Sequence, residues 1–489
     1  MRRFFVKNII FVVAINILVK PVWVFFIDRV VQNRVPGGEY GTYQALLSLG
    51  IIFQIVLDFG ITSYNSRTIA RDPEQLGEVF PSMLSARMVL MGLYMILGYG
   101  WGMLLGYKGW ELNLLAGILL FQSLSALLSF IRSNIAALHR FKTDGILSIT
   151  DRLMMVVICG FLLVYPPTAS HFRIEWFVIT QAACYLVTAI IAWFVLKRIS
   201  GIHLRFSFHL PTVWGIIKQS FPYALLIFQM SIYNRADAMM IERMCADGKA
   251  QADIWASAFR QLDMVNILGL MFATMLLPMY GRMLSNKHDI QPIVKLCANI
   301  LLPFSFAVAV ACIFYSANIM QVLYRGANAD NIRQYRLVFS WLMASFPAWC
   351  LMYIYSTLLT ANGSMKTMNI IAFVGVIFNL SLNFYLIPRY FAAGGAVTSF
   401  LTQSMLAVVF ILACNRIFEL PVNIRWVGAH LGYLCIVAVL AWAAANLLSV
   451  NWMVSAGAFF ACSVVLMFVF RFVSAASIRQ LISKKNAAE

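Results

Sequence analysis

Long apolar stretches follow one another along nearly the whole chain, and this feature most constrains what it can fold into. Of the 489 residues, 62% are hydrophobic and only 11% are charged, with a mean hydropathy of +0.81. A soluble protein of this length carries about 25% charged residues to cover its surface. A membrane-spanning helix instead needs about 20 mostly apolar residues. The solvent around most of this chain is therefore expected to be lipid.

The apolar stretches are continuous, whereas the strands of a membrane barrel alternate between apolar and polar residues. Because only helices and closed barrels satisfy the backbone inside a bilayer, the sequence predicts an all-α, polytopic integral membrane protein. It has room for about fourteen transmembrane helices. The expected spans cover residues 9–31, 41–64, 79–105, 113–137, 146–165, 175–196, 216–242, 253–280, 293–315, 335–360, 368–387, 392–414, 426–448 and 452–472.

Lysine and arginine are distributed unevenly over the connections between these spans. More than twice as many lie on the side that includes both chain ends as on the opposite side. Cytoplasmic loops carry such an excess, so we expect a multi-pass membrane protein with both termini in the cytoplasm. The same bias accounts for the net charge of +18, and nucleic acid is not an expected partner.

One basic connection, from Lys197 to Lys218, is the longest cytoplasmic loop before the tail. It separates six spans from the next six, which is typical of transporters built from two related halves. The expected organisation is an amino-terminal six-helix bundle, a cytoplasmic linker, a second six-helix bundle, and two accessory helices with a tail. These parts cover residues 1–200, 201–215, 216–415 and 416–489, respectively.

Motifs for catalysis and for resident cofactors are missing from the sequence. It has neither the phosphate-binding sequence GxxxxGK[ST] nor the zinc-binding sequence HExxH. We therefore expect no catalytic residues, no metal site and no cofactor, with a proton or a sodium ion as the conceivable coupling ion.

Charged residues inside the spans are the candidate functional residues, because each costs at least ~2.5–3.5 kcal/mol at the bilayer centre and usually faces a cavity or a partner. The basic candidates for substrate binding are Lys20, Arg29, Arg87, Arg132, Arg235 and Arg260. The acidic candidates for ion coupling are Asp58, Asp237 and Asp263.

The seventh and eighth spans place two of these arginines beside carboxylates. Arg235 and Asp237 lie in the outer half of the seventh span, and Arg260 and Asp263 lie in the outer half of the eighth. One interpretation is a buried network of ion pairs that joins the two helices. The other is a hydrated cationic cavity for an anionic group, because a guanidinium binds phosphate through two parallel hydrogen bonds. Both interpretations stay open at this point.

Three short motifs resemble a known family. A G-x-Y in Gly38-Glu39-Tyr40 opens the second span, a D-x-G in Asp58-Phe59-Gly60 closes it, and an R-x-I-A follows at Arg67–Ala70. Together with the number and order of spans, they resemble the O-antigen-type polysaccharide flippases of the multidrug/oligosaccharidyl-lipid/polysaccharide exporter superfamily.

This resemblance implies two six-helix bundles around a cationic central cavity, alternating access, and a lipid-linked oligosaccharide as cargo. The expected function is to flip an undecaprenyl-diphosphate-linked glycan for cell-surface polysaccharide synthesis. Glycosyltransferases and a polymerase of the same pathway are further expected partners. Two alternatives are a cation-coupled drug exporter of the same superfamily, and a polytopic glycan polymerase or glycosyltransferase acting through the loop at residues 316–334.

Overall fold

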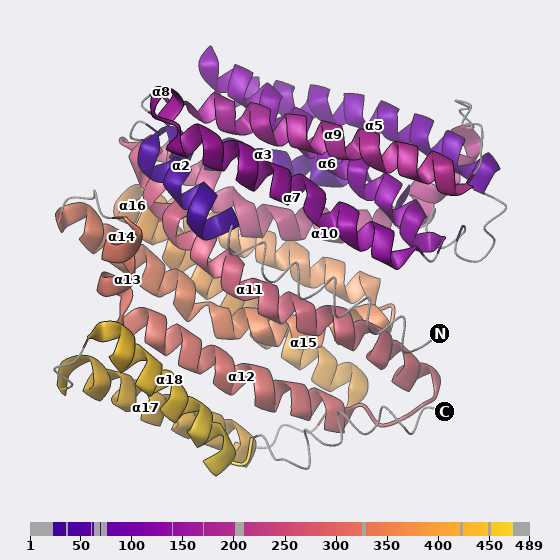
Figure 1. Ribbon diagram of the computed structural model, residues 1–489. Coiled ribbons are helices and arrows are strands. Elements are labelled where there is room, and N and C mark those ends of the chain that lie inside the picture. Colours follow the sequence, from indigo (N-terminus) through magenta and orange to yellow (C-terminus); the bar gives the residue numbers. More distant parts are fainter. Residues whose placement is uncertain are drawn as a thin grey trace. The chain divides into compact units, whose positions relative to one another are not determined.

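The described part of the chain consists of helices and their connections, without a strand (Figure 1). The computed structural model describes residues 23–35, 38–59, 61–62, 69, 76–138, 140–169, 171–200, 210–324, 329–420, 424–447 and 451–472. Lys20 and Arg67 lie outside these residues. The predicted all-α class is confirmed.

Contacts between backbone segments divide the chain into two compact units, Met1–Asp253 and Ile254–Glu489. The bundles expected at residues 1–200 and 216–415, with the linker 201–215 and the segment 416–489, stay a prediction. The first unit contains η1 (Trp23–Asp28), α2 (Arg29–Arg34), α3 (Glu39–Phe53), η2 (Gln54–Leu57), α5 (Leu76–Leu104), α6 (Trp110–Ala137), α7 (Phe141–Val164), α8 (Pro166–Ala169), α9 (Ile174–Ser200) and α10 (Leu210–Met244).

Helix α11 (Gly248–Ser285) begins in the first unit and continues into the second. The other helices of the second unit are α12 (Gln291–Phe314), α13 (Ser316–Leu323), α14 (Ala329–Ala344), α15 (Phe346–Ala361), α16 (Met365–Phe418), α17 (Ile424–Leu447) and α18 (Trp452–Val469).

Ten helical stretches among the described residues are long and apolar enough to cross a membrane. One of them, α16, joins two helices at Phe391, where φ is 55°, and so contains the expected spans 368–387 and 392–414. Helices α10 and α11 have 35 and 38 residues but more charged and polar side chains. With these helices, every expected span has a described helix over at least part of its length. Residues 9–22 of the first span lie outside the described part, and η1 and α2 cover the rest of it.

Apolar side chains at helix–helix contacts form the core of each unit. In the first unit Phe80 of α5 stacks on Phe130 of α6, with ring centroids 5.4 Å apart. In the second unit Val310 of α12 packs with Tyr433 of α17 and Phe459 of α18. The last two helices therefore pack on α12, and they lie side by side in Figure 1 (yellow).

Candidate functional site

The predicted site residues are distributed over both units. Arg29, Arg87, Arg132, Arg235, Asp58 and Asp237 belong to the first unit, whereas Arg260 and Asp263 belong to the second. The side chains of those in the first unit differ in their burial and in the groups that line their surroundings.

Arg87 of α5 is bonded through both terminal guanidinium nitrogens, whereas its buried Nε has no hydrogen-bond partner among the described residues. Its guanidinium donates to the carboxylate of Asp58, to the Thr62 hydroxyl at 3.0 Å and to the Ala126 carbonyl at 2.7 Å. It also lies 5.4 Å from the centre of the Phe130 ring, and only 2% of its side chain is exposed. These contacts join the end of η2 to α5 and α6. An anionic ligand would have to displace Asp58 to reach Arg87.

Arg132 of α6 also has a carboxylate partner but keeps access to solvent. Its Nε lies 2.8 Å from a carboxylate oxygen of Asp144 at the start of α7, and both side chains are 23% exposed. This ion pair joins two consecutive helices at the end that the charge distribution places in the cytoplasm.

Arg29 lies where η1, a π-helix, changes into α2. A π-helical turn widens the spacing of side chains and is frequent at functional sites. A cavity of about 380 Å³ borders this junction, and Arg29, Asn33 and Arg34 line it together with Phe26 and Val30. Residues three or four positions apart face the same side of a helix, as Arg29 with Asn33 and Val30 with Arg34 do. Two arginines thus line one cavity, and the Arg34 guanidinium also donates to the Ala169 carbonyl at 3.4 Å.

Arg235 and Asp237 lie near the middle of α10's second half. Arg235 is partly buried, and Asp237 is completely buried. On α11, in the second unit, the Arg260 side chain is buried and Asp263 is partly exposed.

A cluster that the sequence did not predict joins the α10–α11 turn to the α5–α6 turn. We call it the Glu111 clamp; it consists of Tyr107, Glu111, Glu242, Arg243 and Lys249. The Glu111 carboxylate lies 2.8 Å from Nζ of Lys249 and 3.7 Å from a guanidinium nitrogen of Arg243. The Arg243 guanidinium also covers the Tyr107 ring at 3.4 Å.

The Tyr107 phenol donates a hydrogen bond to the buried carboxylate of Glu242. Burial and the nearby Glu242 carboxylate raise the pKa of Tyr107, so the phenol keeps the proton that it donates. Beside this cluster, the start of α11 packs closely against the backbone of α3 at Gly41. A Cβ atom on Gly41 of α3 would lie 2.6 Å from the backbone nitrogen of Asp253. Asp253 in turn accepts hydrogen bonds from Gln32 at 2.8 and 3.2 Å.

Neutralising Glu111 is expected to loosen the α10–α11 turn. Cys245 of this turn is buried, and burial raises the pKa of its thiol to about 11, so alkylation of the wild-type protein should be slow. Loss of two partly exposed ion pairs costs about 1 kcal/mol. Alkylation of Cys245 by N-ethylmaleimide should therefore be roughly fivefold faster in Glu111→Gln, as measured by peptide mass spectrometry.

Lys108→Gln is the matched control, because Lys108 lies in the α5–α6 turn beside Glu111 but contacts Glu111 only through its backbone, at 3.2 and 3.4 Å. Equal alkylation rates in Glu111→Gln and the wild type would show that the clamp does not hold this turn.

Comparison with known proteins identifies the class of the fold. The structure resembles the lipid II flippase MurJ in an inward closed conformation, with a TM-score of 0.73 over 98% of this chain and 99% of the other, at 14% identity. It also resembles an inward-facing multidrug resistance transporter of the MATE family (TM-score 0.63, 12% identity, 81% and 94% covered). A MATE transporter from Vibrio cholerae gives a TM-score of 0.59 at 15% identity, with 84% and 95% covered.

The fold is thus the one that these flippase and MATE transporter structures share. The polysaccharide biosynthesis protein family matches residues 5–284, more than half of the chain. The chain belongs to this family, which confirms the resemblance found in the sequence. No protein of curated function matches it in a sequence comparison.

Proposed function

We propose that this protein flips an undecaprenyl-diphosphate-linked oligosaccharide across the bacterial inner membrane, with both of its termini in the cytoplasm. The product would serve the synthesis of a cell-surface polysaccharide such as O-antigen. Glycosyltransferases would supply the cargo and a polymerase would consume it. The family membership supports the polysaccharide, and the cavity bordered by Arg29 and Arg34 supports an anionic cargo.

The physical problem is to move a charged, hydrated head group through about 30 Å of hydrocarbon. Each unpaired polar group costs several kilocalories per mole there. The polyprenyl tail can stay in lipid while the diphosphate and the sugars pass through the protein. A diphosphate accepts paired hydrogen bonds from guanidinium groups, and Arg29 and Arg34 present two such groups to one cavity.

The remaining basic residues take graded roles in this proposal. Arg132, which is partly exposed, captures the head group at the cytoplasmic end. Arg235, Lys20 and Arg260 bind the diphosphate further along its path, which opens alternately to the two sides. Arg87 acts differently, because its bonds to Asp58, Thr62 and Ala126 favour a structural role.

Coupling to a proton or a sodium ion is assigned to a carboxylate within the predicted spans. Asp237 is the strongest candidate because it is completely buried in α10, so binding a cation there offsets a large desolvation cost. Asp58 and Asp263 are the other candidates. An imposed proton or sodium gradient across proteoliposomes, with Asp237→Asn as the variant, tests the assignment in the assay described next.

Binding and flipping of the cargo test the proposal. Arg29→Gln should bind undecaprenyl diphosphate roughly tenfold to hundredfold more weakly than the wild type, because a hydrogen bond to a charged group contributes about 1.5–3 kcal/mol. Flipping of a fluorescent undecaprenyl-diphosphate glycan in proteoliposomes should fall in parallel. Arg34→Gln should weaken binding in the same direction.

Arg173→Gln is the control, because Arg173 is an exposed arginine that does not line this cavity. Wild-type binding in both Arg29→Gln and Arg34→Gln would remove this cavity from the proposal. Export of cationic dyes by the purified protein would favour the drug exporter instead, and lengthening of sugar chains would favour the polymerase.

A further inference from the structure

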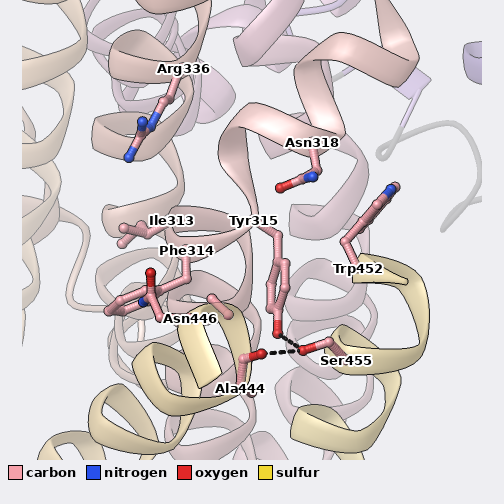
Figure 2. A pocket seen from close by; sticks show the side chains of 10 residues that line it. Ile313, Phe314, Tyr315, Asn318, Arg336, Ala444, Asn446, Trp452 and Ser455 are labelled. Atoms are coloured by element: carbon pink, nitrogen blue, oxygen red, sulfur yellow. Dashed lines mark hydrogen bonds between the residues drawn. The ribbon is translucent and has the colours of Figure 1, made fainter. Parts of the chain in front are cut away.

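A second polar cavity lies in the second unit, apart from the residues used so far. It has a volume of about 570 Å³ and lies among the ends of α12 and α17, the starts of α13 and α18, and α14 (Figure 2). Its lining includes Tyr315, Asn318, Arg336, Asn446 and Trp452.

The floor of this cavity is fixed by hydrogen bonds among three helices. The Tyr315 hydroxyl and the Ser455 hydroxyl are 2.7 Å apart, and Ser455 donates to the Ala444 carbonyl at 2.6 Å (Figure 2). Tyr315 is 3% exposed and Ser455 is 2% exposed. The cavity is therefore a permanent feature of the packing of α12, α17 and α18.

Polar groups with free hydrogen-bonding capacity surround this floor. Within the described part of the chain, the Arg336 guanidinium makes neither an ion pair nor a hydrogen bond, and the Asn318 amide is equally unengaged. The amide nitrogen of Asn446 donates to the Trp442 carbonyl at 2.9 Å. Its amide oxygen is directed toward the side of Arg336 (Figure 2). The cavity thus offers a cation and an acceptor on the same side.

The cavity lies at the ends of three candidate membrane spans, which is the depth at which lipid head groups are found. The candidate membrane spans Gln291–Phe314 and Ile424–Asn446 end at it, and Trp452–Val469 begins at it. Trp452 is an aromatic residue of the type that gathers at the boundary between membrane and water. A ligand in this cavity therefore lies where the phosphates of the bilayer lie.

An apolar stripe continues from the cavity along α17. Trp442 and Val439 lie about one and two turns before Asn446 on the same helix face, and they are 53% and 64% exposed. A phospholipid has a phosphate head group joined to acyl chains. The cavity with Arg336 could hold the phosphate, and the exposed apolar stripe of α17 could contact an acyl chain.

We propose that this cavity binds one phospholipid whose head group carries a hydrogen-bond donor, such as phosphatidylglycerol or phosphatidylethanolamine. The phosphate lies on Arg336 through paired hydrogen bonds, and the Asn318 amide donates to a remaining phosphate oxygen. The hydroxyl or ammonium group of the head group donates to the amide oxygen of Asn446. One acyl chain follows Trp442 and Val439. This site is independent of the proposed flipping function.

Native mass spectrometry of the purified full chain with added lipids tests this site. The wild type should retain one phosphatidylglycerol at least tenfold more tightly than phosphatidylcholine, whose head group has no hydrogen-bond donor. Arg336→Gln should lose roughly tenfold or more in affinity for phosphatidylglycerol. Asn446→Leu should keep the bound phospholipid but lose the preference over phosphatidylcholine.

Arg333→Gln provides the matched control, because Arg333 is an exposed arginine of α14, one turn before Arg336, that does not line the cavity. Equal phosphatidylglycerol affinity in the wild type and Arg336→Gln would overturn the proposal. It would also be overturned if undecaprenyl diphosphate, and not phosphatidylglycerol, were the lipid lost in Arg336→Gln. Loss of flipping in the Arg29 variants leaves these measurements unchanged, so the two proposals fail separately.

Discussion

Arg87→Ala is expected to destabilise the first unit by about 2–5 kcal/mol, mainly because the large Arg87 side chain is buried and its truncation leaves a cavity. Asp58 would lose its guanidinium partner, and the Ala126 carbonyl would lose its 2.7 Å hydrogen bond. The cavity would lie beside Phe130. The midpoint of unfolding of the detergent-solubilised protein, in heat or in sodium dodecyl sulfate, should fall clearly below that of the wild type.

A double-mutant cycle separates the ion pair from the packing. Asp58→Asn alone should also destabilise the protein, and Arg87→Met with Asp58→Asn should destabilise it less than the two single changes together, because neither charge is then left unpaired. Additive effects would show that Arg87 and Asp58 do not act as a pair. A stable Arg87→Ala variant that loses only cargo binding would return Arg87 to the binding site.

Gly41→Ala is expected to separate α3 from the start of α11. The added Cβ atom would lie 2.6 Å from the Asp253 nitrogen and 3.1 Å from the Ala252 carbonyl carbon. Both are backbone atoms, so relief requires a shift of a whole helix end. Overpacking of this kind costs about 1–3 kcal/mol, and the bonds from Gln32 to Asp253 would be strained as well. The thermal midpoint should fall, and Cys245 should become more reactive toward maleimides.

Gly92→Ala is the matched control for this substitution. Gly92 is also a helical glycine of the first unit, and nothing lies within 4 Å of a Cβ atom placed on it. Alanine is favoured over glycine in a helix by about 1 kcal/mol, so this variant should be as stable as the wild type or more stable. The proposed role of Gly41 is wrong if both alanine variants have the same stability and the same Cys245 reactivity.

The motifs that carried the family resemblance are explained by packing. Gly38, with φ of 88°, begins α3 in a left-handed conformation that glycine adopts without strain. Tyr40 donates to a carboxylate oxygen of Asp28 at 2.9 Å. Asp58 of the D-x-G motif holds Arg87.

The long apolar stretches by themselves determined that the chain is an all-α polytopic membrane protein, because a backbone in lipid has few ways to satisfy its hydrogen bonds. They also placed most helices, although α11 extends five residues beyond its predicted span at each end and the span 335–360 is divided between α14 and α15. The short motifs indicated the family. Sequence alone could not show which intramembrane charges have partners. Arg87, for example, is a single charge in an apolar stretch of the sequence, yet in the structure the carboxylate of Asp58 holds it.

Only the tertiary structure showed which groups surround each intramembrane charge, because those groups are far apart in the sequence. Tyr107 meets Glu242, and Trp452 shares a cavity with Asn318, through packing that no local pattern encodes. The apolar stretches therefore fixed where helices form, since that depends on the transfer of each segment into lipid. The chemistry along those helices depends on which side chains the packing brings together.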